Sequence, residues 1–172
     1  MDADAKKTSL RMIPYGIYVM TADHGKGNVG AATVNWVTQS SFGPPLVVVG
    51  VKADSGAHTV VKGTGKFILN MLGKDGKGAA FSFFKPAKLE DGKLEDGKLN
   101  GFGFKAGANG CAILDIAIAA VECSVKEVLE MGDHSVVVAE VTEAHLMKAP
   151  EGRTDAAILE MKELGDNVYY GG

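Results

Sequence analysis

The strongest constraint on the fold is a continuous apolar run, LVVVGVK, from Leu46 to Lys52, which follows the pair Pro44-Pro45. The run is far shorter than the roughly 20 residues that span a bilayer, and its valines are typical of a strand. A strand that is apolar at almost every position must be covered on both faces. The sequence therefore predicts a core strand here, inside a protein built largely of sheet.

Strand-like runs separated by glycine-rich turns recur along the chain, and helical patterns are few. The expected strands cover residues 15–22, 30–38, 46–52, 66–72, 113–128 and 135–146. The expected helices start at Asp54 or Ser55 and end near Val61, then cover residues 78–84 and 155–164. Many short strands with few helices predict a mainly β fold, a closed or nearly closed β-barrel with peripheral helices.

The length of 172 residues fits one domain, residues 1–172. At residues 88–101 the sequence KLEDGKLEDGKLNG repeats a short unit that is too small for a solenoid, so a solvated loop is expected there. Residues 150–172 are expected to form a final helix, with Thr154 as its N-cap and Gly165 as its stop, followed by a tail.

Composition excludes several classes of function. The net charge of −3 argues against nucleic acid or an acidic membrane as the main partner. The first seven residues are polar and resemble no signal peptide, so a cytoplasmic protein is expected. Cys111 and Cys123 lack metal-ligand spacing and are expected to be free thiols rather than a disulfide.

Two familiar patterns are incomplete. Gly25-x-Gly27-x-x-Gly30 matches the dinucleotide-binding fingerprint, but β-branched residues follow it where that mechanism needs a helix. The histidines show neither HxxxH nor HExxH spacing, so no metal site is predicted. They are His24, His58, His134 and His145.

Nucleophilic hydrolysis has little support. Ser41, His58 and Asp54 contain the residue types of a catalytic triad, but the chain has no GxSxG elbow. Serines at the end of a strand are also common turn residues.

The most informative residues lie between Thr33 and Ser41. Thr33 and Val34 would form the wall of a strand, Asn35 adds an amide donor and acceptor, and Trp36 adds a stacking surface. These features suit the flat ring of a heterocycle.

Groups suited to a phosphate follow in the sequence. Gln39, Ser40 and Ser41 offer uncharged donors. Asp54, Ser55 and His58 open a helix, where free backbone N–H groups favour an anion, and Lys52 and Lys85 could add charge. The residues together predict a site for a mononucleotide such as FMN, although an ordinary polar turn before Pro44-Pro45 is the alternative reading.

An ordered set of motifs resembles the flavin reductase-like family of FMN-binding split barrels. The motifs are YGIYVMT at 15–21, TVNW at 33–36, Ser41, PPLV at 44–47, SGAH at 55–58 and GKFILN at 65–70, followed by NGCAIL at 109–114, VEC at 121–123 and GDH at 132–134. The spelling NWVTQSSFGPP is similar to the flavin reductase-like module of flavodiiron proteins. The resemblance covers roughly residues 10 to 146.

This resemblance implies a six-stranded Greek-key split β-barrel, a homodimer and one FMN per subunit near the dimer interface. By position, residues 33–36 would line the isoalloxazine, and residues 39–41 would contact the ribityl chain or phosphate. Asp54, Ser55 and His58 would lie near the phosphate. His134 is the candidate for the nicotinamide side, and its alternative is an ordinary exposed histidine of a hairpin turn.

Two departures from the family pattern are visible. Trp36 stands where the family often has Ser, and Ala57 stands where the family often has a second phosphate-binding hydroxyl. The resemblance also implies that late aromatic residues such as Tyr169 and Tyr170 could cover a neighbouring subunit's flavin, while a frayed tail is the alternative.

The function that follows is an NAD(P)H:flavin reductase, an oxidoreductase that passes hydride from nicotinamide to flavin N5. The acceptor would be free flavin or a redox partner protein. Two alternatives stay open at this point. One is a flavoredoxin-like FMN electron carrier to a protein partner, and the other is a flavin-binding module without turnover.

Overall fold

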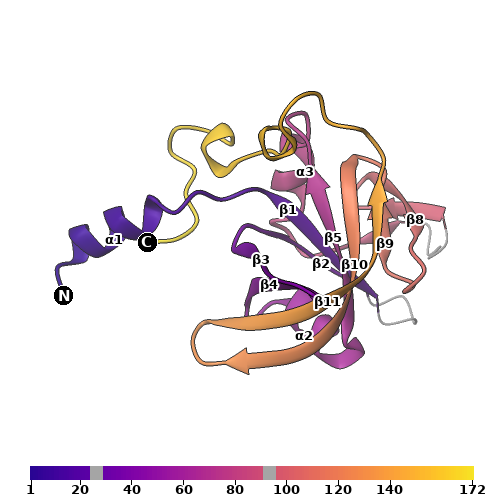
Figure 1. Ribbon diagram of the computed structural model, residues 1–172, viewed down its shortest axis with the longest axis horizontal. Coiled ribbons are helices and arrows are strands. Elements are labelled where there is room, and N and C mark those ends of the chain that lie inside the picture. The colour runs from indigo at the N-terminus through magenta and orange to yellow at the C-terminus, as the bar shows by residue number, and fades with distance from the viewer. Residues whose placement is uncertain (24–28, 91–95) are drawn as a thin grey trace.

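The computed structural model describes residues 1–23, 29–90 and 96–172 and shows a mainly β protein with two antiparallel sheets (Figure 1). The seven strands of the larger sheet are β1 Tyr18–Asp23, β2 Val29–Val34, β3 Val37–Phe42, β4 Pro45–Lys52, β5 Lys66–Leu72, β10 Ala117–Glu130 and β11 His134–Leu146. The four strands of the smaller sheet are β6 Leu89–Glu90, β7 Asp96–Leu99, β8 Phe102–Ala106 and β9 Ala112–Leu114.

The larger sheet has the order β2-β1-β5-β10-β11-β4-β3. Its two end strands, β2 and β3, are consecutive in the chain and are joined by Asn35 and Trp36, which lie outside both strands. The Gly50 N–H of β4 donates to the Trp36 carbonyl at 2.8 Å. Among the described residues no ring of paired strands closes, so the mainly β class is confirmed but the six-stranded Greek-key split barrel is not.

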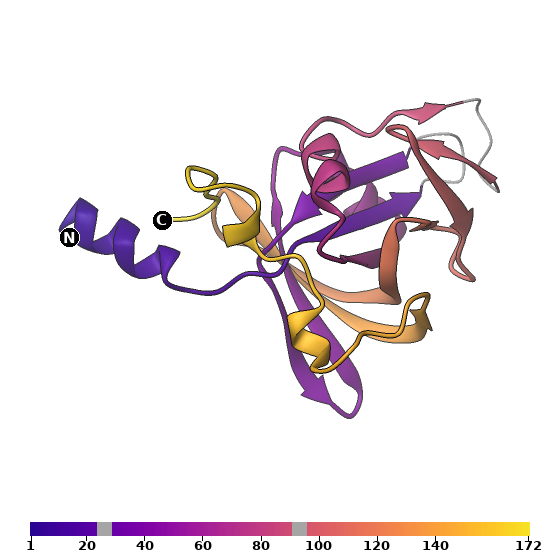
Figure 2. The same cartoon turned by 90° about the horizontal axis from the view of Figure 1, so that it is seen from above.

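The strand predicted at 30–38 is therefore broken in two. Residues 29–34 pair with β1, whereas residues 37–42 pair with β4. The bend at Asn35-Trp36 directs the second half along a different neighbour, as Figure 2 shows for the β3–β4 hairpin that extends away from the body.

The larger sheet carries apolar core on both faces. On one face, Met20, Val49 and Leu69 pack in a cluster with residues of helix α2 Gly56–Thr64. On the other face, a second cluster joins β1 and β5 to helix α3 Lys77–Ser82 and to the smaller sheet. The run at 46–52 forms strand β4, and every residue from Leu46 to Val51 is buried or half-buried. The prediction of a covered strand is thus confirmed.

Helix α2 begins where the sequence indicated and runs one turn further than expected. The Ser55 side chain caps it by accepting from the His58 N–H at 3.1 Å. The helix continues past Val61 to Thr64 and ends at Gly65, whose φ of 68° is in the left-handed region that glycine favours.

The solvated loop expected at 88–101 is wrong in part. Part of the loop expected at 88–101 forms strands β6 and β7, and Leu99 is fully buried in the core. Two segments lie outside the described residues. One is 91–95, within the repeats, and the other is the expected hairpin 24–28 with His24, Gly25 and Gly27.

The final helix expected at 155–164 is also absent. Two 3₁₀ turns, Thr154–Ala156 and Met161–Glu163, flank an extended stretch instead. Its centre is Leu159, whose carbonyl accepts from the Ile17 N–H at 2.7 Å and whose N–H donates to the Leu72 carbonyl at 2.8 Å. Because both backbone groups of Leu159 bond to other segments, a continuous helix cannot form through it.

Helix α1 Ala3–Arg11 projects from the body and has no buried residue (Figures 1 and 2). Its C-terminal end meets the end of the chain, where Arg11 Nε donates to the Gly171 carbonyl at 3.2 Å. The end of the chain therefore lies beside α1, on the same side of the molecule as the N-terminus (Figures 1 and 2).

Asn70 links the two sheets from a fully buried position. Its Nδ2 lies 3.1 Å from the Val19 carbonyl, 3.2 Å from Thr21 Oγ1 and 3.3 Å from the Ala112 carbonyl. Its Oδ1 accepts from the Leu114 N–H at 2.9 Å. One amide side chain thus joins β1, β5 and β9.

A second buried polar group holds the turn before β9. Glu122 on β10 is 1% exposed, and its carboxylate accepts from the N–H groups of Ala108 (2.9 Å) and Asn109 (2.6 Å). His145 Nε2 lies 2.8 Å from the same carboxylate. Burial by itself would raise the pKa of Glu122, but the hydrogen bonds from His145, Asn109 and Ala108 outweigh it and lower that pKa.

The variant Glu122→Gln is expected to lower the free energy of unfolding by about 1–3 kcal/mol at pH 7, because its NH₂ group cannot accept from a backbone N–H. A lowered folded-state pKa means that the stabilisation is present above the ordinary pKa of 4.5 and is lost as the pH falls through the folded value. Urea unfolding at pH 7 and pH 4 should therefore show a difference between variant and wild type that shrinks at the lower pH. The exposed Glu127 of the same strand provides the control, Glu127→Gln. A difference that is equal at both pH values would contradict the ionic role.

Candidate functional site

Two adjoining cavities lie where β2, β4 and the start of α2 come together. The first has a volume of about 200 Å³ and the second about 710 Å³. Only the second by itself is within the usual size range of ligand sites. They share Lys52, Ser55, Phe83 and Phe84 in their walls. A ligand with a ring at one end and a charged group at the other could therefore occupy both.

The end of β2 forms the wall of the first cavity. Thr33, Val34 and Asn35 line it. The Thr33 hydroxyl donates to the Ala80 carbonyl at 2.7 Å, and the Thr33 N–H donates to the Phe83 carbonyl at 3.1 Å. Since both donors of Thr33 are engaged in holding β2 against α3, this residue offers a stable surface rather than free hydrogen-bonding groups.

The start of α2 and the end of β4 provide charge and hydroxyl groups in the second cavity. Lys52 Nζ lies 2.9 Å from Asp54 Oδ1. Hydrogen bonding and charge attraction between them raise the pKa of Lys52 and lower that of Asp54. The Ser55 hydroxyl donates to the Lys52 carbonyl at 2.7 Å, which places the lysine beside the N-terminus of the helix. A cation next to a helix N-terminus suits a phosphate.

The structure brings together six of the predicted site residues. Five line the first cavity: Thr33, Val34, Asn35, Ser55 and His134. Asp54 lines the second cavity, together with Ser55. The strand end and the helix start, separate in the sequence, thus form one continuous site.

Four predicted residues lie elsewhere. Gln39, Ser40 and Ser41 lie on β3, and none of them lines either cavity. Gln39 and Ser40 are exposed, and Gln39 Nε2 donates to the Ser41 carbonyl. The bend before β3 explains this, because it carries residues 37–42 away from the end of β2. His58 points into the body instead, with Nε2 2.9 Å from Ser135 Oγ.

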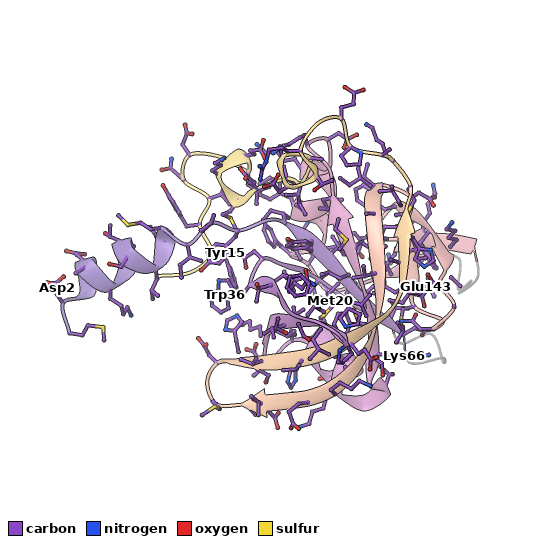
Figure 3. The ribbon with its side chains drawn as sticks, in the orientation of Figure 1. Asp2, Tyr15, Met20, Trp36, Lys66 and Glu143 are labelled. Atoms are coloured by element: carbon purple, nitrogen blue, oxygen red, sulfur yellow. The ribbon has the colours of Figure 1, made fainter. Side chains whose placement is uncertain are left out.

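Trp36 lies behind the cavity wall rather than in it. Its indole packs over Gly50, with ring centroids 4.5 Å from His134 and 5.5 Å from Tyr170. Figure 3 shows it on the side of the body nearest α1. Its Nε1 is buried and has no hydrogen-bond partner among the described residues.

His134 stands between two polar partners at the start of β11. Nδ1 lies 2.9 Å from Asp133 Oδ1, and Nε2 lies 2.7 Å from the Tyr170 hydroxyl. The hydrogen bond and charge of His134 lower the pKa of Asp133. In the tautomer that donates from Nδ1 to Asp133, Nε2 accepts from the Tyr170 hydroxyl.

Other lining residues were not predicted from the sequence. Phe83 and Phe84 border both cavities, and Met161 and Tyr170 border the first. The aromatic run FSFF at 81–84 was the available signal. For Tyr170 the sequence left open a cover over a neighbouring subunit's flavin or a frayed tail; within its own chain, its hydroxyl contacts His134.

Within the described residues, no group of three or more His, Cys, Asp and Glu side chains could hold a metal ion. In the same residues, no helix combines the length and apolar character required to cross a membrane. Cys111 and Cys123 are buried free thiols, as expected.

The match to a family model decides the classification. The model described as "Flavin reductase like domain" matches residues 10–162. The chain belongs to the flavin reductase-like family.

Relatives of this flavin reductase-like chain include diflavin flavoprotein A 1 of Synechocystis, which is 31% identical over 154 residues. The match covers 90% of this chain and 26% of that protein. Another is the stachydrine N-demethylase reductase subunit Stc3 of Rhizobium meliloti, 29% identical over 82% of this chain and 58% of that protein. The chain thus spans only part of these relatives.

Solved structures support the same fold for the flavin reductase-like chain. The NADH:FAD oxidoreductase SgcE6 of Streptomyces globisporus has a TM-score of 0.65 and 25% identity, covering 78% of this chain and 71% of that one. The styrene monooxygenase flavin reductase of Pseudomonas putida has a TM-score of 0.69 over 94% of this chain and 93% of that one. At 24% identity the latter indicates the fold alone.

Proposed function

We propose that this chain binds a flavin across the two cavities and acts as an NAD(P)H:flavin reductase. The observation that carries the proposal is the continuity between the wall at Thr33 to Asn35, beside the apolar rings of Phe83 and Phe84, and the start of α2, where Lys52 and Ser55 lie. The wall suits a flat ring, and the helix start suits a phosphate. Family membership and the NADH:FAD oxidoreductase SgcE6 support the reaction class.

A bound flavin would supply the hydride-accepting ring, and the protein would bind and orient the two rings. Thr33 and Val34 hold the flat wall, since the threonine is tied to α3. Asn35 and His134 face the same cavity and would orient ring edges through hydrogen bonds. Phe83 and Phe84 would exclude water. No side chain has to transfer a proton for hydride transfer, so the site needs no catalytic acid or base.

The finer parts of the proposal are FMN as the flavin, NADH or NADPH as the donor, and free flavin or a partner protein as the acceptor. A homodimer and a cytoplasmic location belong to the proposal as well.

The proposal also includes a single domain that closes as a split barrel. It is supported by the end strands of the larger sheet, β2 and β3, because they are consecutive in the chain. Burial raises the pKa of Cys111 to about 11 and that of Cys123 to about 12, so both thiols stay protonated and unreactive at neutral pH.

The test is to purify the protein, record flavin absorbance, and follow NADH and NADPH oxidation with and without added free flavin. Turnover that depends on free flavin supports the reductase. A tightly yellow protein that NAD(P)H does not bleach would indicate the electron-carrier alternative. A protein that binds no flavin at micromolar concentration contradicts both.

Lys52→Ala is expected to weaken FMN binding about five- to tenfold and to leave riboflavin binding almost unchanged, because riboflavin lacks the phosphate. Flavin fluorescence titration measures both dissociation constants. The control is Lys62→Ala, since Lys62 is an exposed lysine paired with Glu130 away from both cavities. An equal loss for FMN and riboflavin would remove Lys52 from the phosphate site.

A further inference from the structure

The C-terminal tail, residues 168–172, reaches the first cavity through Tyr170. Tyr170 lines that cavity directly. The end of the chain runs between α1 and the body of the protein (Figures 1 and 2). The tail therefore stands beside the groups that are proposed to contact the ligand.

The tail occupies or covers three polar groups of the proposed site. Asn35 Nδ2 donates to the Tyr170 carbonyl at 3.3 Å, and His134 Nε2 lies 2.7 Å from the Tyr170 hydroxyl. Gly171 lies against Trp36, so close that a Cβ on the glycine would be 3.6 Å from the indole Nε1. Burial raises the pKa of Tyr170, so its hydroxyl is protonated at neutral pH and can donate to His134.

Beyond its contacts in the site, the tail is anchored at Val168, which packs against the core, while most of its last residues are exposed. Tyr170 is 41% exposed. The tail is held from outside by Arg11, which donates to the Gly171 carbonyl and stacks over the Tyr169 ring at 4.3 Å. Arg11 belongs to α1, a helix with no buried residue.

The position of the tail against the site also has a cost in free energy. Trp36 Nε1 is buried without a hydrogen-bond partner in the described part of the chain. An unsatisfied buried donor costs about 1–3 kcal/mol. Withdrawal of the tail would remove that cost and free the Asn35 amide.

We propose that residues 168–172 form a strap that competes with the ring of the ligand for Asn35 and His134. The proposal rests on the proposed flavin site and assigns a means of regulation to it. The ligand it opposes is a flat heterocycle with carbonyl acceptors at its edge. Because binding requires the open state, the apparent dissociation constant equals the intrinsic one divided by the open fraction.

The test compares Tyr170→Ala and Tyr170→Phe with Tyr169→Phe, the matched removal of a neighbouring hydroxyl. Tyr170→Ala should lower the FMN dissociation constant about three- to tenfold, because the open fraction rises. Tyr170→Phe should have a smaller effect, and Tyr169→Phe should have none.

A second measurement follows the strap without ligand. Trp36 is the single tryptophan of the chain, so tryptophan fluorescence reports on this one position, which contacts the tail through Tyr170 and Gly171. Acrylamide should quench Trp36 more strongly in Tyr170→Ala than in wild type. Unchanged quenching, or equal or weaker FMN binding by Tyr170→Ala, overturns the strap. Increased quenching with no FMN binding by any variant overturns instead the proposed flavin site and the competition that depends on it.

Discussion

Replacing Asn70 with aspartate is expected to lower the free energy of unfolding by about 3–5 kcal/mol at pH 7, the largest effect among the substitutions considered for this protein. The Asn70 NH₂ group faces three oxygen atoms, those of Val19, Thr21 and Ala112. A carboxylate in its place would present negative charge to three acceptors in a site with no solvent exposure. Urea unfolding followed by circular dichroism measures the loss.

The same experiment includes its own check. The loss in Asn70→Asp should shrink as the pH is lowered, because a protonated carboxyl can donate again to one of the oxygens. The control is Asn167→Asp, the same chemical change at an exposed position. If Asn70→Asp were as stable as Asn167→Asp, the junction between the sheets would not depend on this amide.

Gly50→Ala is expected to weaken flavin binding by about tenfold and to destabilise the fold by about 1–3 kcal/mol. A Cβ at Gly50 would lie 2.9 Å from Trp36 Cε3 and 3.1 Å from Trp36 Cβ, so the indole has to move. Because Trp36 packs against His134 and Tyr170, its displacement would disturb the first cavity although Trp36 does not line it.

The control for this steric effect is Gly78→Ala in α3, where an added Cβ meets nothing within 4 Å. That variant should bind flavin as the wild type does. Dissociation constants from fluorescence titration and midpoints from urea unfolding separate the two effects of Gly50→Ala. A variant that loses stability but keeps its flavin affinity would show that the position of Trp36 does not matter for the site.

Features that depend on local chemistry could be predicted from the sequence. The strand at 66–72 has the predicted bounds, and Ser55 and Gly65 begin and end α2 as capping preferences indicate. Thr33, Val34 and Asn35 line one cavity together, since neighbouring residues at a strand end remain together.

Features that depend on distant partners could not be predicted. The segment 155–164 has a helical pattern, yet the backbone of Leu159 pairs with Ile17 and Leu72. Gln39, Ser40 and Ser41 follow the wall in sequence, but the bend at Asn35-Trp36 separates them from it. Single-sequence patterns contain no information about such pairings, because propensity describes a segment in isolation.

The packing of Trp36 over Gly50 also has an evolutionary consequence. An indole at position 36 leaves no room for a side chain at position 50. In a protein of this fold with a small residue such as serine at position 36, that space is open and a side chain at position 50 can fill it. The two positions, one in the connection between β2 and β3 and the other on β4, should therefore change together as sequences diverge.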